Sequence, residues 1–147
     1  MIALIQKVST ANVSVQSKKI AETKKGLLVF LGIYKNDDTD DIFKVSKKIL
    51  NLRIFNNNRK KAQLSITDIA GEILLISQFT LCADVKKGNR PSFTKAMNSS
   101  DALTYFNLAY QELNKSVITK KGIFGEDMKV SLINEGPITI IVNTKNE

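Results

Sequence analysis

Histidine is absent from this 147-residue chain, and cysteine occurs only once, at position 82. One chain without histidine cannot build a Ser-His-Asp triad or a Cys-His pair, and a zinc site made from cysteine and histidine is excluded as well. Catalysis would have to use hydroxyls, amides, carboxylates, lysines, backbone groups or the substrate itself. We therefore expect neither a metal nor another cofactor.

Long apolar runs are also missing. No run approaches the roughly 18 residues that a membrane-spanning helix needs, and the first apolar stretch already reaches a lysine at position 7. We expect a soluble, cytoplasmic protein with no secretion signal and no membrane partner. The lone Cys82 agrees with a reducing compartment, and its place in the apolar run FTLCA favours a buried thiol over a reactive one.

The composition is that of a globular protein, with 43% apolar and 24% charged residues, and the length suits a single domain over residues 1–147. The net charge of +8 favours a polyanionic partner, although a lysine-rich solvated surface would give the same total. Nineteen of the 22 basic residues are lysines, spread over the chain. The segment KKGNRPS differs, because it gathers Lys86, Lys87 and Arg90 in a loop punctuated by glycine and proline.

Apolar periodicity predicts two helices, within residues 37–53 and 99–113, the second capped by Ser99 or Ser100. Apolar or alternating runs predict strands: two within 2–16, then 19–23, 26–33, 53–56 and 71–85, and a closing pair around Gly136-Pro137. Helices placed between strands favour an α/β fold. We expect a three-layer sandwich, in which the helices cover one sheet and a second sheet lies behind it.

Two polar segments interrupt these apolar patterns, at residues 77–80 and 134–137. Each has an ordinary explanation, since serine and threonine occur in strands and a Gly-Pro pair often marks a turn. A second explanation is functional. Proline is the residue that most readily holds a cis peptide bond, and such a bond after glycine would present two neighbouring carbonyls that can accept hydrogen bonds from an ammonium group.

Four segments carry a resemblance to a known family. SQFTL at 77–81, KKGNRPSF at 86–93, GIFGEDMKVSL at 122–132 and NEGPIT at 134–139 resemble the motifs of the D-aminoacyl-tRNA deacylases. The similarity follows the order of the family over essentially the whole chain, and it also includes MIALIQ, GLLVFLGI and LRIF. SQFTL and GPIT at this separation form a specific combination, whereas either alone would be weak.

The resemblance implies the fold of that family and a cytoplasmic, homodimeric hydrolase whose active sites lie at the subunit interface. Such enzymes cleave the ester between a D-amino acid, or glycine, and the 3′ end of tRNA, and they reject L-aminoacyl-tRNA. In the family the Gly-Pro bond is cis and enters the active site of the partner subunit. Carried over, Gly136 and Pro137 would bind the α-amino group of the substrate.

The resemblance also assigns the other site residues. Gln78, Phe79 and Thr80 would be catalytic, with a backbone N–H from Phe79, and Ser77 would bind substrate. The basic character of the KKGNRPS loop, rather than the resemblance, leads us to expect that Lys86, Lys87 and Arg90 contact tRNA, and we expect no DNA partner. One position departs from the pattern: Lys7 stands where the family usually has an arginine that braces the Gly-Pro loop, and lysine lacks the planar fork of donors.

Two mechanisms and three function classes stay open, the third class being a structural dimerisation domain, which would explain the apolar strands but not the basic charge. The family is thought to work largely through the 2′-hydroxyl of the terminal ribose of tRNA, and we prefer this substrate-assisted route over a nucleophilic Thr80, for which the sequence offers no obvious general base. A basic RNA-binding module without catalysis would also explain the charge and the loop. It would leave the polar interruptions at 77–80 and 134–137 unexplained.

Overall fold

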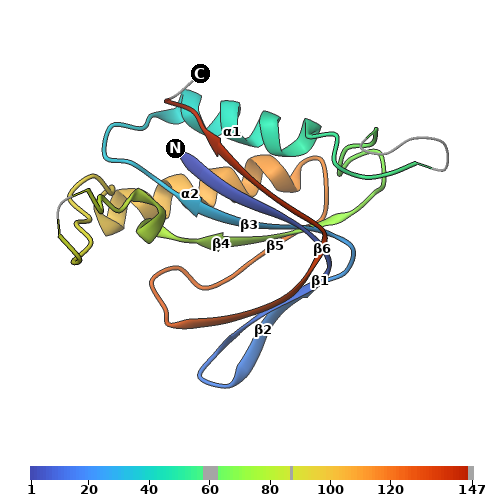
Figure 1. Cartoon of the computed structure of the whole chain (residues 1–147), viewed down its shortest axis with the longest axis horizontal. Helices are drawn as coiled ribbons and strands as arrows, with labels where there is room; N and C mark the ends of the chain where they lie inside the picture. The colour runs from blue at the N-terminus through green and yellow to red at the C-terminus, as the bar shows by residue number, and fades with distance from the viewer. Residues whose placement is uncertain (58–62, 87, 146–147) are drawn as a thin grey trace.

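The computed structural model describes residues 1–57, 63–86 and 88–145, which fold into two helices and a curled six-stranded sheet (Figure 1). The strands are β1 (Ile2–Val15), β2 (Lys18–Thr23), β3 (Gly26–Gly32), β4 (Glu72–Ser77), β5 (Thr119–Lys121) and β6 (Met128–Asn143). The helices are α1 (Thr39–Asn51) and α2 (Ser99–Asn114), and a short 3-10 helix, η1, covers Phe79–Cys82. No helix in this described part of the chain is long and apolar enough to cross a membrane.

The sheet contains both parallel and antiparallel strands, and the carboxyl ends of β3 and β4 lie side by side. β3, β4 and β5 run parallel, while β1 is antiparallel to β2, β3 and β6. α1 connects β3 to β4, and α2 follows η1 and leads to β5. Because β3 and β4 are parallel neighbours, Leu31 and Ser77 lie side by side at the same edge of the sheet. This edge is where ligands commonly bind in sheets of this kind.

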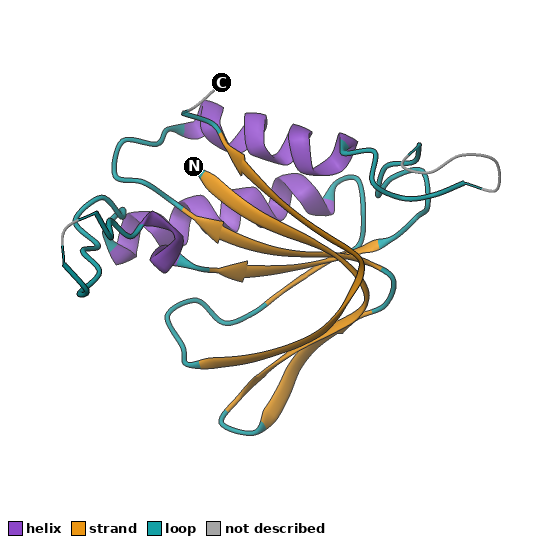
Figure 2. Ribbon diagram, viewed as in Figure 1, coloured by secondary structure: helices purple, strands orange, loops and turns teal. Residues whose placement is uncertain are grey.

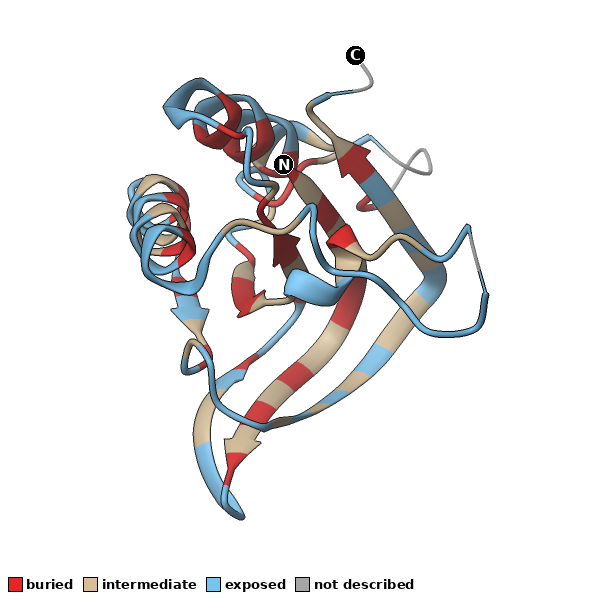
Figure 3. Ribbon diagram, turned by 90° about the vertical axis from the view of Figure 1, so that its left-hand side faces the viewer, coloured by how far each residue is buried: buried red, intermediate tan, exposed pale blue. Residues whose placement is uncertain are grey.

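Both helices pack on one face of the sheet, as Figure 1 shows. α1 begins with a capping box, in which Asp38 accepts from the backbone N–H of Asp41 and the Asp41 carboxylate accepts from the N–H of Asp38. The apolar stripes predicted from the sequence are buried in this interface, and each helix also carries exposed residues (Figure 3). The buried stripes include Ile42, Val45 and Ile49 of α1 and Phe106, Ala109 and Leu113 of α2.

The opposite face of the sheet has an apolar core of its own. The sheet curls so that β2 and the far halves of β1 and β6 turn toward β3 and β4 (Figure 2), in a nearly closed, barrel-like form. Val8, Val13, Leu28 and Leu74 are fully buried in this second core. The α/β class is thus confirmed, but the strands form one curled sheet, and the expected three-layer sandwich of two separate sheets is not confirmed.

Several predicted boundaries were wrong. The first run forms one strand, β1, because β6 pairs with it nearly from end to end. The strand expected at 53–56 is reduced to a bridge between Phe55 and Leu64. The strand expected over 71–85 ends at Ser77, and η1 begins two residues later. The expected closing pair of strands is a single interrupted strand, β6. The short strand β5 was missed.

The N-cap of α2 is Asn98, not Ser99 or Ser100, since the Asn98 side chain accepts a hydrogen bond from the N–H of Asp101. The interpretation of Cys82 as a core thiol is confirmed. Its side chain is buried, and this burial raises the pKa of the thiol to about 11.

Candidate active site

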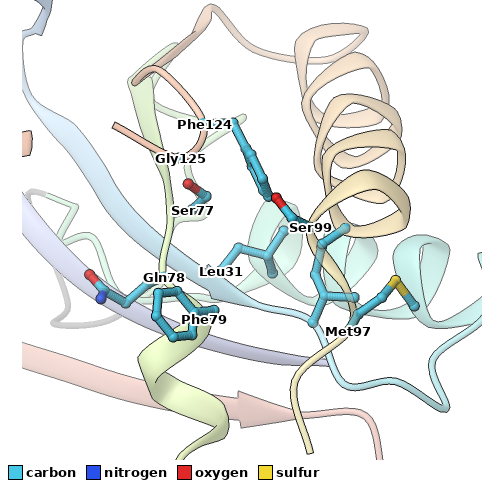
Figure 4. A pocket seen from close by; sticks show the side chains of 10 residues that line it. Leu31, Ser77, Gln78, Phe79, Met97, Ser99, Phe124 and Gly125 are labelled. Atoms are coloured by element: carbon cyan, nitrogen blue, oxygen red, sulfur yellow. The ribbon is translucent and has the colours of Figure 1, made fainter. Parts of the chain in front are cut away.

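A cavity of about 290 Å³ opens at the carboxyl ends of β3 and β4. One wall is the polar turn after β4, and the others come from β3, from the segment that leads into α2, and from the loop after β5 (Figure 4). The cavity is lined by Leu31, Ile33, Ser77, Gln78, Phe79, Met97, Ser99, Ala102, Phe124 and Gly125. Its walls are mostly apolar, while the turn and Ser99 supply hydroxyl, amide and backbone polar groups.

The turn after β4 is held by backbone hydrogen bonds. The N–H of Gln78 donates to the carbonyl of Leu31 on β3 at 2.8 Å, and the N–H of Leu81 donates to the carbonyl of Gln78 at 3.2 Å. Gly32 permits the close approach of the turn to β3, because a Cβ atom at Gly32 would lie 3.1 Å from the Gln78 carbonyl oxygen. The polar residues that interrupt the apolar pattern therefore end β4 and start η1.

Of the residues predicted in this turn, Ser77, Gln78 and Phe79 line the cavity. Thr80 is exposed and does not line it, but its hydroxyl accepts a hydrogen bond from the Gln78 side-chain amide at 2.5 Å. An amide N–H can only donate, so this contact does not activate Thr80 as a nucleophile.

Among the described residues that line the cavity, none has a carboxylate, an amine or another side chain that titrates near neutral pH. The cavity can therefore position a ligand and offer hydrogen bonds, but its own side chains supply no general base. The described part of the chain also contains no group of three or more Asp, Glu or Cys residues placed to hold a metal ion.

The second polar segment loops out of β6. Gln6 of β1 pairs with Thr139 and Val8 pairs with Asn134, so one residue of β1 faces the four residues 135–138 of β6. The side-chain amide of Asn134 closes this loop by donating to the Ile138 carbonyl at 3.0 Å. Gly136 and Pro137 lie in the loop, are exposed, and are not among the residues that line the cavity.

The peptide bond between Gly136 and Pro137 is cis, as the resemblance implied. Gly136 has a φ of +120°, a conformation that side chains disfavour. Lys7, the residue of β1 opposite this loop, is buried, and its ammonium lies 5.5 Å from the centre of the Phe55 ring. That cation–π contact points the charge at the core side of the sheet.

The basic loop after η1, residues 84–95, is held by hydrogen bonds at its two ends. Asp84 and Ser92 exchange backbone hydrogen bonds of 2.8 and 3.0 Å. The Lys95 ammonium donates to the Asp84 carboxylate at 2.8 Å, which holds the pKa of that carboxyl below its usual range. Lys86 and Arg90 are exposed in this loop, and Lys87 lies outside the described residues.

This chain resembles known proteins over nearly its whole length. The sequence profile of the family described as D-Tyr-tRNA(Tyr) deacylase matches residues 4–143. The chain belongs to this family. Proteins named D-aminoacyl-tRNA deacylase from Thermodesulfovibrio yellowstonii and Flavobacterium psychrophilum are each 49% identical to it, over 99% and 100% of this chain and 100% and 99% of their own lengths.

Solved structures place this deacylase-family chain in the same fold. A structure described as "c-Myc DNA Unwinding Element Binding Protein" is 37% identical and superposes with a TM-score of 0.94, covering 98% of this chain and 99% of that one. A structure described as a probable eukaryotic D-amino acid tRNA deacylase superposes with a TM-score of 0.83 over 96% of this chain and 97% of its own, at 14% identity, which shows the fold alone.

The sequence did not reveal the apolar walls of the cavity. Leu31 and Met97 come from a predicted strand and from a loop, and neither carried a signal of its own. Phe124 and Gly125 lie in GIFGEDM, a segment used only for its resemblance. Its two glycines, which punctuate a loop between β5 and β6, were the signal that could have led to this wall.

Proposed function

We propose that this protein hydrolyses the ester between a D-amino acid and the 3′ end of tRNA, releases the D-amino acid and free tRNA, and spares the L-aminoacyl ester. Glycyl-tRNA is a second substrate in this proposal. The observation that carries it is the polar turn at residues 77–79, which faces an apolar cavity in a chain that matches D-aminoacyl-tRNA deacylases over nearly its full length. The whole chain, 1–147, would act as one cytoplasmic domain.

The turn supplies polar groups for the reacting ester. Phe79 is the first residue of η1, and the first N–H groups of a helical turn have no acceptor within it. A backbone donor at this position can stabilise the negative charge that develops on the carbonyl oxygen of the ester when water attacks. Ser77 and Gln78 would orient the acyl group beside it.

The chemistry is assigned largely to the tRNA. Water adds to the ester carbonyl with help from the terminal ribose 2′-hydroxyl, the ester C–O bond breaks, and the ribose oxygen leaves with a proton. Two observations support this route. The described lining of the cavity holds no side-chain base, and the Thr80 hydroxyl accepts its hydrogen bond from an amide that cannot take a proton. Holding the reactants in position can lower such a barrier by several kcal/mol.

The site is completed by a second copy of the chain. In this proposal, Gly136 and Pro137 of one subunit reach the cavity of the other, where their carbonyls accept hydrogen bonds from the α-ammonium of the substrate and their bulk excludes the L-isomer. The loop is exposed and does not line the cavity of its own chain, which supports a role in trans. β6 also exposes Ile133 and Ile141 at 60% and 62%, as expected for a strand that a second copy covers.

The test is hydrolysis of D-Tyr-tRNA and L-Tyr-tRNA by the purified protein, with Pro137→Ala in parallel. We expect rapid loss of the D-ester only, and a large fall in that rate for the variant. Cleavage of neither ester, together with tRNA binding, would instead support the second candidate, a basic RNA-binding module without catalysis. Equal cleavage of both esters would contradict the assignment of Gly136 and Pro137 as a chiral filter.

A further inference from the structure

Two exposed aromatic rings pack together beside the cavity, and one of them, Phe79, lines it. Phe79 and Phe93 pack edge to face, with ring centroids 5.1 Å apart and an interplanar angle of 70°. Phe79 is 57% exposed and Phe93 39% exposed, although phenylalanine usually lies inside a protein. Phe79 also lines the cavity (Figure 4), whereas Phe93 packs against Phe79 and is not among the lining residues.

Both rings are mounted on hydrogen-bonded backbone. Phe79 opens η1, whose turn is anchored to β3 through Gln78. Phe93 follows Ser92, which pairs with Asp84, and its own carbonyl accepts from the N–H of Ala96 at 3.0 Å. The apolar pair is therefore held in place from two sides. A rigid, exposed aromatic pair of this kind can receive a flat ligand without first losing conformational entropy.

The surroundings of the pair are basic. Residues 84–95, which carry Phe93, contain four basic residues and one acidic residue, Asp84, which is already paired with Lys95. Lys86 and Arg90 are exposed in the same loop. Aromatic rings beside cationic side chains are the usual arrangement for binding single-stranded nucleic acid, because bases stack on the rings and the cations contact phosphates.

We propose that the Phe79–Phe93 pair is a stacking platform for the base of the penultimate nucleotide of the tRNA acceptor end. This inference rests on the proposed function, since that function puts the esterified terminal nucleotide in the cavity and its single-stranded neighbour at the rim. The platform makes the enzyme prefer a polynucleotide ester to an aminoacyl-nucleoside. It adds binding energy without taking part in the chemistry.

The test compares D-tyrosyl esters of tRNA, of a cytidylyl-adenosine dinucleotide and of adenosine alone. Phe93→Leu removes the ring and keeps an apolar side chain. The variant should lower kcat/KM for the tRNA and dinucleotide esters by about 5- to 100-fold, the range expected for one base–aromatic stack, mainly through KM. It should leave kcat/KM for the adenosine ester unchanged. Phe93→Tyr, which keeps an aromatic ring, should have kcat/KM values close to those of the natural protein.

The matched control is Phe43→Leu, because Phe43 is a 55% exposed phenylalanine on α1. This change should affect none of the three esters. An equal loss on all three esters in Phe93→Leu, or no loss on any, would overturn the platform. So would dissociation of the native assembly in size-exclusion chromatography, since that would make the pair a contact between subunits.

A binding experiment separates this inference from the proposed hydrolysis. Uncharged acceptor-stem RNA with its 3′ single strand is titrated with the protein, either intact or with an abasic penultimate nucleotide. The natural protein should bind the abasic RNA about 5- to 100-fold more weakly, whereas Phe93→Leu should bind both RNAs alike. Equal binding of both RNAs by the natural protein would overturn the platform even if D-esters are hydrolysed. If no ester is cleaved but this difference is found, only the hydrolase proposal fails.

Discussion

The Nζ atom of Lys145 lies 2.7 Å from Oδ2 of Asp41, joining the segment after β6 to the first turn of α1. Asp41 is buried, which by itself raises its pKa. Hydrogen bonds from Lys145, Thr144 and the Asp38 backbone outweigh this effect and hold the pKa of Asp41 well below its ordinary value. Protonation of this carboxylate at low pH would therefore weaken both the cap of α1 and its contact with the segment after β6.

Asp41→Asn tests this link. Because the folded pKa is depressed, the stabilisation by Asp41 is complete above about pH 4, the ordinary pKa of Asp, and is lost as the pH falls further, toward the folded pKa. The variant should lower the free energy of unfolding by about 1–2 kcal/mol at pH 7, and the difference should shrink steadily below about pH 4. Urea unfolding between pH 2.5 and 7 measures it. The control is Asp40→Asn, on the same turn but exposed, which should lower the free energy of unfolding by about 0.5 kcal/mol or less at every pH. If the difference between Asp41→Asn and the natural protein stayed constant with pH, the interpretation would be contradicted.

Thr80→Ala separates the two mechanisms of hydrolysis. If the Thr80 hydroxyl only accepts the hydrogen bond from the Gln78 amide, the single-turnover rate for D-Tyr-tRNA should fall by less than about tenfold. A tenfold fall corresponds to about 1.4 kcal/mol in the activation free energy. Loss of a true nucleophile should instead cost about 10⁴-fold or more. Thr80→Val, which keeps the shape of the side chain, controls for packing. A large loss in both variants, with burst kinetics in the natural protein, would favour an acyl-threonine intermediate.

Asn134→Ala removes the hydrogen bond that closes the loop carrying Gly136 and Pro137. We expect a loss of about 1 kcal/mol in the free energy of unfolding and a larger effect on function, with kcat/KM for D-Tyr-tRNA reduced at least about tenfold because the loop is no longer held. Asn51→Ala also loses a bond from its amide to a backbone carbonyl, that of Lys47 on α1. It should change stability similarly and leave hydrolysis unchanged. Equal kinetics in both variants would show that the bond of Asn134 does not position the loop.

The basic loop predicts a salt dependence. Neutralising Lys86 or Arg90, or Lys87 between them, should weaken tRNA binding and reduce the slope of log K against log salt by about 0.7 for each single-strand phosphate that the protein no longer neutralises. Binding measured from about 50 to 300 mM salt gives this slope. Lys47→Gln, on the exposed surface of α1, is the control and should leave the slope unchanged. If the loop variants also leave it unchanged, the tRNA lies on another surface.

Residue patterns alone were enough to predict the two helices, the strand β3 and the two polar segments. Helical spacing of Ile42, Val45 and Ile49 buries one face of α1, and a short continuous apolar run is typical of a strand covered on both sides, as β3 is. The polar segments 77–80 and 134–137 were visible because they break such runs. Hydrogen bonding to neighbouring strands, which sequence does not display, decided where β4 ends and that β6 continues past Gly136-Pro137.

The environment of the polar turn could not be predicted from the sequence. The cavity exists because parallel pairing puts Leu31 beside Ser77, while packing of α2 and of the loop after β5 brings Ala102 and Phe124 to the same edge. These walls come from segments that are far apart in the chain, and their residues are ordinary apolar ones. Likewise, the edge-to-face contact between Phe79 and Phe93 depends on the pairing of Asp84 with Ser92, because that pairing folds the basic loop back onto η1.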